Sequence, residues 1–430
     1  MNVSRIYIGT NPTDEFDFHL YPGQNLYTGE KPFIEHFGVI NSLEQDLLNL
    51  ASGVYGVDLV IHRNEREHFI RTFDVHIEVV NYHAFELIKN EIEKALYIVS
   101  RDNWNITFIQ KDGDITQKIE WNDNEGAVLL FSGGLDSMSA ASKFIQDQEN
   151  LVLVSHNTQG NRVVDEHQRN VHDLLEKFYD TTIKHFHIKV YGRKHREYEF
   201  PEDRENTQRT RSFLFLSLAT LVTRRVGFKK VLYMAENGQF AIHLPLNQSR
   251  VGPFSTHTAD PEFVDTFRSL VRNLFNNSDF DLINPFLYMT KGEVFATLPP
   301  ELQKQAHLSG SCWMISRIQK HCGYCIPCIS RRIAIEHNSL SFDEYQENIF
   351  DTDLNKLSDT DDRKRNIIDY LEFISKFKNI TPANRTSVLI EFPELFNDSI
   401  NTDEALKMYE RVSQQSYDVF KNYPRIEKLL

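Results

Sequence analysis

The sequence contains few cysteines, no Walker A motif and no long apolar run. There are only four cysteines among 430 residues, and all of them lie between Cys312 and Cys328, which indicates one site rather than scattered core thiols. No segment approaches the roughly eighteen apolar residues that a membrane-spanning helix needs, and the N-terminus lacks the apolar core of a secretory signal. These absences predict a cytoplasmic protein that does not enter a membrane.

Basic residues are outnumbered in this chain. It carries 47 lysines and arginines against 61 aspartates and glutamates, which gives a formal net charge of −14. Such a charge repels nucleic acid, so a nucleic acid substrate would need a local basic patch. A small molecule or a protein is therefore the expected partner. The length and the ordinary apolar content allow two or three domains.

A pair of glycines follows an apolar run near residue 130. Residues 127–131 form a run of strand length, and apolar residues recur at helical spacing after residue 137. The turn between them reads Ser132-Gly-Gly-Leu-Asp-Ser137. Adjacent glycines leave backbone amides unshielded, and a helix N-terminus favours an anion. The pattern predicts a phosphate-binding loop, although glycines also occur in turns between buried elements. It is not a Walker A loop, because Gly-x-x-x-x-Gly-Lys-Ser/Thr is absent.

The residues after this turn alternate between strand and helix patterns. Strand patterns at 151–154, 185–190 and 231–235 are separated by helical patterns, notably 165–179. This alternation is typical of a doubly wound parallel sheet, an α/β fold with helices on both faces. Ligands of such sheets bind at the carboxyl ends of the strands. His156, at the end of the second strand, is therefore a candidate for contacting a nucleotide, although it could instead cap the backbone.

Three basic side chains near helix starts are candidates for binding an anion. Arg209 and Arg211 precede a helix that is almost wholly apolar, which places them at an edge of the sheet. Arginine suits bidentate contact with phosphate or carboxylate, but both residues could simply belong to a solvated helix start. Lys291 lies near another helix start, from which it could reach a substrate phosphate.

The flanking regions show no chemical motif. Residues 1–122 alternate strand and helix patterns and predict a separate α/β accessory domain. Residues 239–261 lose periodicity, which favours a lid over a disordered insertion. Residues 339–430 predict an acidic, solvated linker followed by a helical tail, with helices from residue 361 and over 402–420. The central domain is expected to span 126–338.

The four cysteines lie close together in the sequence. Cys312, Cys322, Cys325 and Cys328 have the spacing Cys-x9-Cys-x2-Cys-x2-Cys. Four thiolates fill the tetrahedral shell of Zn²⁺ and leave no open position, which predicts a structural zinc knuckle. Gly323 would provide the tight turn between the ligands. An iron–sulfur cluster is the alternative occupant.

The loop and the cysteine cluster together resemble the 7-cyano-7-deazaguanine synthase (QueC) family of PP-loop ATPases. The resemblance extends over roughly residues 126–337, and four segments carry it: Ser132–Ser137, Arg211 with Phe215–Ser217, Pro285–Glu293, and the four cysteines. It implies a HUP-type adenine nucleotide-binding fold that uses ATP, Mg²⁺ and Zn²⁺. ATP would be held by the loop and by His156, with the loop contributing Phe131, Ser132, Gly133, Gly134, Leu135, Asp136 and Ser137. Asp136 would bind Mg²⁺, and Arg211 and Lys291 would offset charge on the substrate carboxylate and the α-phosphate.

The chain also departs from that family. Ser212 stands where the family has asparagine, residues 239–261 replace a segment that contains aspartate, and both flanking regions lack a counterpart. The combination resembles the QatC-type branch of bacterial anti-phage defence islands. It implies adenylation of 7-carboxy-7-deazaguanine and transfer to a nitrogen nucleophile, either ammonia or an amine of a protein partner from the defence operon.

Two other functions fit parts of the pattern. A PP-loop enzyme that modifies tRNA would share the phosphate loop, but the cysteine spacing and the negative charge count against it. A nucleotide-binding module of a defence complex, without catalysis, would share the architecture. The intact Ser-Gly-Gly-x-Asp-Ser turn counts against that loss of activity.

Overall fold

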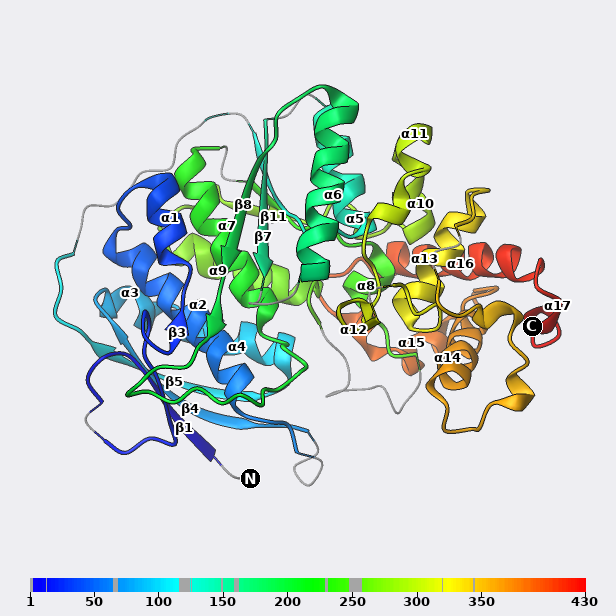
Figure 1. The fold of residues 1–430 in the computed structure, drawn as a ribbon. Coiled ribbons are helices and arrows are strands. Elements are labelled where there is room, and N and C mark those ends of the chain that lie inside the picture. The colour runs from blue at the N-terminus through cyan, green and yellow to red at the C-terminus, as the bar shows by residue number, and fades with distance from the viewer. Residues whose placement is uncertain are drawn as a thin grey trace.

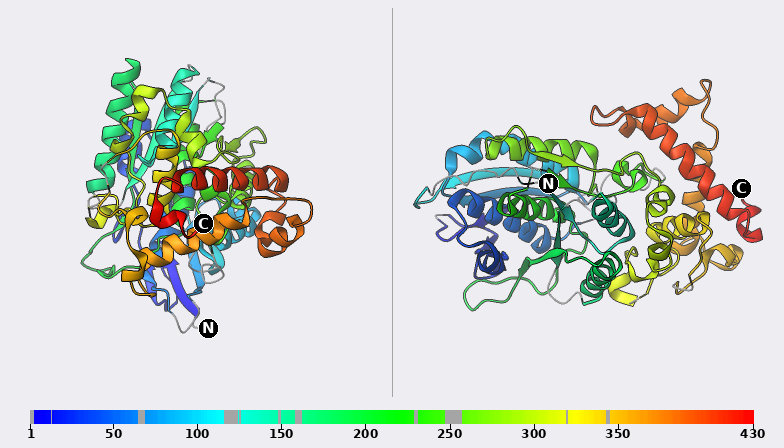
Figure 2. Two further views of the ribbon diagram at one scale, coloured as in Figure 1. Left: turned by 90° about the vertical axis from the view of Figure 1, so that its right-hand side faces the viewer. Right: turned by 90° about the horizontal axis from the view of Figure 1, so that it is seen from above.

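The computed structural model describes residues 3–12, 14–64, 69–115, 124, 126–147, 150–157, 162–228, 231–246, 257–318, 320–342 and 345–430. The chain is arranged as an N-terminal sheet, a central sheet and a C-terminal group of helices (Figure 1). Seen from above, the N-terminal sheet and the C-terminal helices lie at opposite ends of the molecule (Figure 2). Among the described helices, none combines the length and apolar character that a membrane crossing requires.

The central sheet has five parallel strands in the order β11-β10-β6-β7-β8. Its strands are β6 (Ala127–Leu130), β7 (Leu151–Asn157), β8 (Lys184–Lys189), β10 (Val231–Tyr233) and β11 (Asp281–Ile283). The chain moves outward from β6 through β7 and β8, and then returns to build β10 and β11 on the other side. The order therefore reverses between β6 and β10, where open α/β sheets bind ligands. The predicted parallel α/β sheet is confirmed, and its order is compatible with a PP-loop fold.

Helices cover this sheet on both faces. The main ones are α5 (Leu135–Gln146), α6 (Arg162–Tyr179), α7 (Arg211–Val226), α9 (Pro261–Leu274), α10 (Lys291–Ala296) and α13 (Ile326–His337). Helix α7 packs on β6 and β7 and also on two helices of the N-terminal region. Because both of its faces are covered, its sequence is apolar nearly all round rather than along one stripe.

The N-terminal region contains a parallel sheet of its own with helices, and its apolar core is continuous with that of the central sheet. Its strands run in the order β2-β1-β4-β5, where β1 is Val3–Ile8, β2 is Phe18–Leu20, β4 is Thr72–Val79 and β5 is Asn103–Gln110. Its helices are α1 (Glu30–Phe37), α2 (Ser42–Val60), α3 (Tyr82–Leu87) and α4 (Lys89–Ser100). The alternating apolar residues of β4, from Phe73 to Val79, are fully buried. The expected strand at 73–79 is therefore confirmed.

Two features of the fold, a strand pair and an ion network, connect this unit to the central domain. Strand β3 (Leu26–Tyr27) pairs antiparallel with β9 (Tyr191–Gly192), which follows the central strand β8. A buried ion network lies nearby, in which Arg71 Nη2 contacts Asp58 at 2.5 Å and Asp102 at 2.6 Å. Asp58 also accepts hydrogen bonds from the amide and hydroxyl of Thr210, just before α7. The N-terminal unit is thus tied to the start of a central helix.

Replacing Arg71 with methionine is expected to destabilise the protein by about 3–5 kcal/mol, because buried Asp58 loses the cation that pairs with it, while Asp102 keeps Arg63 at 2.6 Å. Burial alone would raise the pKa of Asp58, but Arg71 and the Thr210 amide outweigh it and hold that pKa below its ordinary value. The pairing therefore stabilises the fold above about pH 4 and is lost as the pH falls through the folded-state pKa. Urea denaturation at neutral pH measures the effect. Lys194→Met, at an ion pair whose side chains are 84% and 83% exposed, is the control and should change stability by less than about 1 kcal/mol.

The C-terminal region is helical, as predicted. It contains α14 (Asp362–Lys376), α15 (Arg385–Glu391), α16 (Thr402–Phe420) and α17 (Pro424–Glu427). Helix α16 packs against α13 of the central domain and against a short helix, α8 (Gly238–Ile242). Figure 2 shows α16 lying along one side of this end of the molecule. The helical tail is therefore in contact with the elements that follow β10 and β11.

Two expectations for irregular segments are wrong in part. The region from Gln239 begins with α8 rather than with an irregular loop, and residues 247–256 lie outside the described residues, so the lid is untested. The acidic stretch after residue 338 is not a solvated linker throughout. Ile349 and Phe350 in the 3₁₀ helix η4 (Ile349–Asp351) are fully buried. These two apolar side chains pack into the core, whereas the surrounding acids stay near the surface.

Candidate functional site

The glycine turn connects the end of β6 to the start of α5. Gly133 has φ = 75°, and a Cβ at this position would lie 2.8 Å from the backbone nitrogen of Gln168. Both facts require glycine there. Ser137 Oγ donates to the carbonyl oxygen of Gly134 at 3.0 Å and lies 3.3 Å from Ser132 Oγ. The turn thus places two hydroxyls beside a helix N-terminus, where a phosphate would be favoured.

Asp136, in the first turn of α5, forms a buried ion pair with Lys291. Its Oδ1 accepts from Lys291 Nζ at 2.7 Å, and its Oδ2 accepts from the Asn237 side chain at 2.6 Å and from the Asn237 amide at 3.0 Å. Lys291 is the first residue of α10, and Thr290 and Glu293 form a capping box around it. Burial would raise the pKa of Asp136, but Lys291 and Asn237 outweigh it, so the pKa lies below its ordinary value. Asp136 is therefore ionised.

Glu236 lies beside Asp136, directly after β10. Burial raises its pKa well above the ordinary value, and the negative charge of Asp136 raises it further. Two carboxyl groups that close together cannot both ionise readily, so the charged form of Glu236 is disfavoured beside ionised Asp136. Asn284, after β11, holds this segment through hydrogen bonds to the amide and carbonyl of Glu236 at 3.2 and 2.8 Å. The site therefore places an ionised carboxylate beside a carboxyl group whose ionisation is disfavoured.

These groups line a cavity of about 200 Å³ at the carboxyl end of the central sheet. The turn contributes Ser132, Gly134, Leu135 and Asp136 to its wall. The other lining residues come from five further places in the chain: Ala235, Glu236, Phe240, His243, Thr258, Lys291, Gly310, Ser311, Trp313 and Pro327. The cavity lies at the reversal of strand order between β6 and β10, where the sheet topology places a ligand.

The structure brings together some of the residues that the sequence singled out. Asp136 and Lys291 are in direct contact, and Ser132 lines the same cavity. Arg211 is half-buried and donates from Nη2 to the carbonyl oxygen of His156 at 3.1 Å, outside the cavity lining. The roles predicted for Arg211 and His156 remain predictions, because the geometry does not test them.

His156 and Phe131 are fully buried. His156 meets the ring of Tyr55 from the N-terminal unit, with ring centroids 5.4 Å apart. Burial and nearby Arg211 lower the pKa of His156 to about 3, so its ring is neutral. The Phe131 ring stands edge-on to His185, and its carbonyl oxygen accepts from Ser155 Oγ at 2.5 Å. Their side chains therefore face the protein interior.

Several lining residues received no role from the sequence. Glu236 follows the fourth central strand, a position that could have marked it, while Phe240, His243 and Trp313 have no local signal. Asp260 followed by Pro261 does carry one, because aspartate at the N-cap and proline at the first helical position mark a helix start. Recognising this helix start would have ended the expected irregular segment before Asp260.

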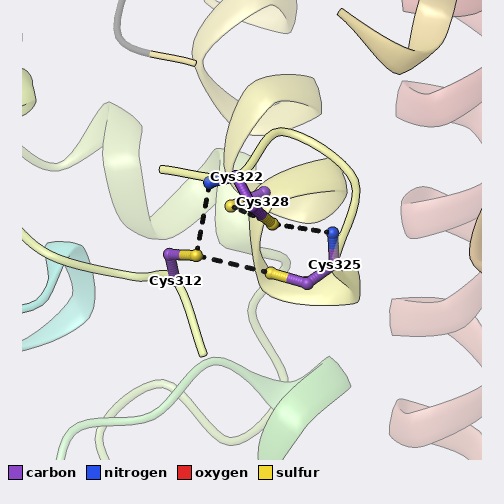
Figure 3. A group of neighbouring side chains, drawn as sticks. All are labelled: Cys312, Cys322, Cys325 and Cys328. Carbon is purple, nitrogen blue, oxygen red and sulfur yellow. Dashed lines mark hydrogen bonds between the residues drawn. The ribbon is translucent and has the colours of Figure 1, made fainter. Parts of the chain in front are cut away.

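The four cysteines form a compact, buried cluster with no disulfide. Figure 3 shows their side chains facing one another. The Cys322 and Cys328 sulfurs lie 3.8 Å apart, and those of Cys325 and Cys312 lie 3.9 Å apart. Zinc–sulfur bonds of about 2.3 Å in a tetrahedron place neighbouring sulfurs about 3.8 Å apart. The cluster could therefore hold a metal ion, and its spacing fits four-sulfur coordination.

The cysteine segment forms one wall of the cavity. Gly310 donates from its amide to the carbonyl oxygen of Gly133 at 3.0 Å. Ser311, just before Cys312, is held by Arg331 Nη1 at 3.1 Å and by His321 Nε2 at 3.2 Å. Arg331 is on α13, the helix that also carries Cys328. The cysteine cluster and the glycine turn are thus connected through a few short contacts.

Gly323→Ala is expected to destabilise the cysteine segment by at least about 2 kcal/mol. Gly323 has φ = 87°, and an added Cβ would lie 1.9 Å from the carbonyl oxygen of Glu347. The turn between Cys322 and Cys325 would have to move away from the 345–350 segment. Thermal unfolding measures the change, and Gly38→Ala is the control. It shares a positive φ of 77° but has no neighbour within 4 Å of the added atom, so an equal loss in both variants would contradict the steric account.

The parallel sheet, the glycine turn at its switch point and the cysteine cluster are compatible with the PP-loop class of nucleotide-binding proteins. Comparison with known families gives a match over residues 126–339 to the model described as "Queuosine biosynthesis protein QueC". The chain is also 24% identical over 230 residues to the 7-cyano-7-deazaguanine synthase of Sulfolobus acidocaldarius, covering 50% of this chain and 46% of that protein. The chain thus spans about half the length of that curated relative. The two matches support a QueC-like family for this chain.

Proposed function

We propose that the chain is an ATP-dependent enzyme that activates the carboxylate of a 7-deazaguanine, 7-carboxy-7-deazaguanine, and passes it to a nitrogen nucleophile. The observation that carries the proposal is the Asp136–Lys291 pair beside the glycine turn, in a cavity within the QueC-like region. In the first step the carboxylate oxygen attacks the α-phosphorus of ATP and pyrophosphate leaves. In the second step the nitrogen attacks the acyl carbon and AMP leaves.

The residues of the cavity suit these two steps. The amides and hydroxyls of the turn, with Ser132 and Ser137, would hold the departing pyrophosphate. Lys291 would offset charge that develops at the α-phosphate. Its position in the capped first turn of α10 fixes its backbone beside the cavity. Asp136 would bind Mg²⁺, which supplies charge neutralisation across the phosphates. Arg211 remains a candidate for the substrate carboxylate.

Zinc is the proposed occupant of the cysteine cluster. Four thiolate donors with tetrahedral spacing suit Zn²⁺ and leave no open position, which fits a structural role. Gly310 of this segment contacts Gly133, and Arg331 holds Ser311 in place. A bound metal would therefore help to fix the position of the cavity wall. Zinc would therefore support nucleotide binding without taking part in the reaction.

The nitrogen nucleophile is proposed to be an amine of a protein partner in a bacterial anti-phage defence system. Ammonia needs no accessory regions, whereas this chain adds an N-terminal α/β unit and a C-terminal helical region to the QueC-like part. An amine on a macromolecule would need additional surface for docking. The defence role and the partner rest on the sequence resemblance alone.

The chain with Mg²⁺ and ATP is expected to release AMP and pyrophosphate only when 7-carboxy-7-deazaguanine is added. Chromatography of nucleotides measures AMP, and intact mass measures transfer to candidate partner proteins or to ammonium. Guanine, which lacks the carboxylate, is the matched control. AMP release that is independent of the deazaguanine would contradict the substrate, and efficient nitrile formation from ammonium without any gain in protein mass would contradict the protein acceptor.

A further inference from the structure

His243 occupies an unusual backbone position at the edge of the cavity. It follows α8 with φ = 51° and ψ = 55°, in the left-handed region that non-glycine residues seldom adopt. Such a conformation is strained for a residue with a Cβ and persists where the surrounding structure enforces it. His243 lines the cavity that also contains Asp136 and Lys291. The strained backbone is therefore found at a residue beside the proposed reaction centre.

The neighbouring elements hold α8 firmly. The Gly238 amide donates to Met289 at 2.9 Å, and a Cβ on Gly238 would lie 2.3 Å from the carbonyl oxygen of Leu287. On the other side of His243, the Leu244 amide donates to the hydroxyl of Tyr409 on α16 at 3.4 Å. His243 is thus fixed between the element after β11 and the C-terminal helix.

A second histidine and an aspartate lie behind His243. The His243 and His257 rings are 5.7 Å apart between centroids and nearly perpendicular. His257 Nδ1 lies 3.4 Å from Asp260 Oδ2, and the other oxygen of Asp260 caps α9. Thr258, between them, lines the cavity. The carboxylate end of this row is anchored by the helix, and His243 at the other end lines the cavity.

Among the described residues that line the cavity, His243 is the histidine, and it shares that wall with Asp136 and Lys291. Burial and the charge of His257 lower the pKa of His243 to about 4, although Asp260 opposes the shift, so its imidazole is neutral at neutral pH. A neutral imidazole can accept a proton, and the row formed with His257 and Asp260 places a carboxylate near it. His243 is therefore the candidate base of the cavity.

We propose that His243 is the catalytic base of the nitrogen-transfer step, an inference that rests on the function proposed above. The nitrogen lone pair forms the C–N bond at the acyl carbon, and the bond from that carbon to the AMP oxygen breaks. The nitrogen loses a proton to the imidazole, and AMP leaves with the bonding electrons. The first step, attack of a carboxylate on ATP, releases no proton and does not need His243.

The test separates the two steps with His243→Asn, since asparagine tolerates the left-handed backbone. ATP–pyrophosphate exchange with 7-carboxy-7-deazaguanine is expected to stay within about threefold of the unmodified enzyme. Single-turnover transfer to ammonium is expected to fall at least about 100-fold. Transfer to hydroxylamine, a less basic amine whose nitrogen is more acidic after attack and loses its proton to water more readily, should fall less than about tenfold. His195→Asn, at a half-buried histidine outside the cavity lining, is the matched control.

His243→Gly provides an independent measurement, because glycine adopts the same backbone without strain and leaves space for added imidazole. Imidazole is expected to restore transfer to ammonium in this variant. Unchanged transfer in the asparagine variant would overturn the proposal. Equal losses with ammonium and hydroxylamine, or no rescue by imidazole, would also overturn it and make His243 a positioning residue. Absence of exchange in the unmodified enzyme would instead contradict the proposed function.

Discussion

Asp136→Asn is expected to reduce ATP–pyrophosphate exchange at least about 1,000-fold, because the amide neither binds Mg²⁺ nor pairs with a cation. The effect should be confined to activity. Burial and the charge of Asp136 beside it raise the pKa of Glu236 and disfavour its ionisation. Once that charge is gone, Glu236 can ionise and become the counter-charge of Lys291. Thermal unfolding should therefore change little.

A double variant tests this explanation. Combining Asp136→Asn with Glu236→Gln leaves the buried Lys291 without a nearby carboxylate, so stability should fall by about 3 kcal/mol more than the sum of the single changes. Asp147→Asn is the control for the single variant, because Asp147 pairs with Lys143 where both side chains are about half exposed. Exchange that survives in Asp136→Asn would contradict the assignment of the phosphate site.

Cys328→Ser is expected to abolish metal binding and to leave the chain largely insoluble or unfolded at 37 °C. Cys328 is fully buried and holds the N-terminal part of α13 to Cys322. Structural zinc contributes on the order of 10 kcal/mol to small zinc domains, so losing one ligand removes much of the stabilisation of this segment. Elemental analysis of the purified chain measures the metal, and the soluble fraction measures folding.

The control for this prediction is Met314→Leu, a change of similar volume at a neighbouring residue that is not a ligand. It should keep about one metal ion per chain. Because Ser311 and Gly310 belong to the same segment, any soluble Cys328→Ser protein should also bind ATP more weakly. A soluble, metal-free variant with unchanged ATP affinity would contradict the structural role of the metal.

The features that the sequence predicted correctly are local in the chain. The turn after β6 is specified by two adjacent glycines, and the cysteine cluster by ligands within one short segment. The strands and helices follow from apolar periodicity over a few turns. Each of these signals is complete before any tertiary contact forms, so the parallel α/β architecture could be predicted.

The features that the sequence did not predict depend on distant contacts. Glu236 acts on Asp136 from about 100 residues away, and no spacing rule links the two. Lys291 was expected in the site only through the family resemblance, and its direct ion pair with Asp136 was not predicted. Arg209 was expected at a ligand edge, yet its Nη1 donates to the carbonyl oxygen of Ser100 in the N-terminal unit. The burial of Ile349 was not predicted, because the segment was interpreted from its acidic composition. The average composition of a segment does not identify a single buried side chain.

The pairing of β3 with β9 has a consequence for the order in which the chain folds during synthesis. Tyr27 pairs with Tyr191. The chain between them includes the rest of the N-terminal unit and the central strands β6, β7 and β8. A ribosome that adds about 5–20 residues per second needs roughly 10–30 s to bridge this gap. For that interval the N-terminal sheet emerges without β9 and without Thr210, which completes the hydrogen bonds of Asp58. Nascent N-terminal units are therefore exposed to chaperones until the central domain arrives.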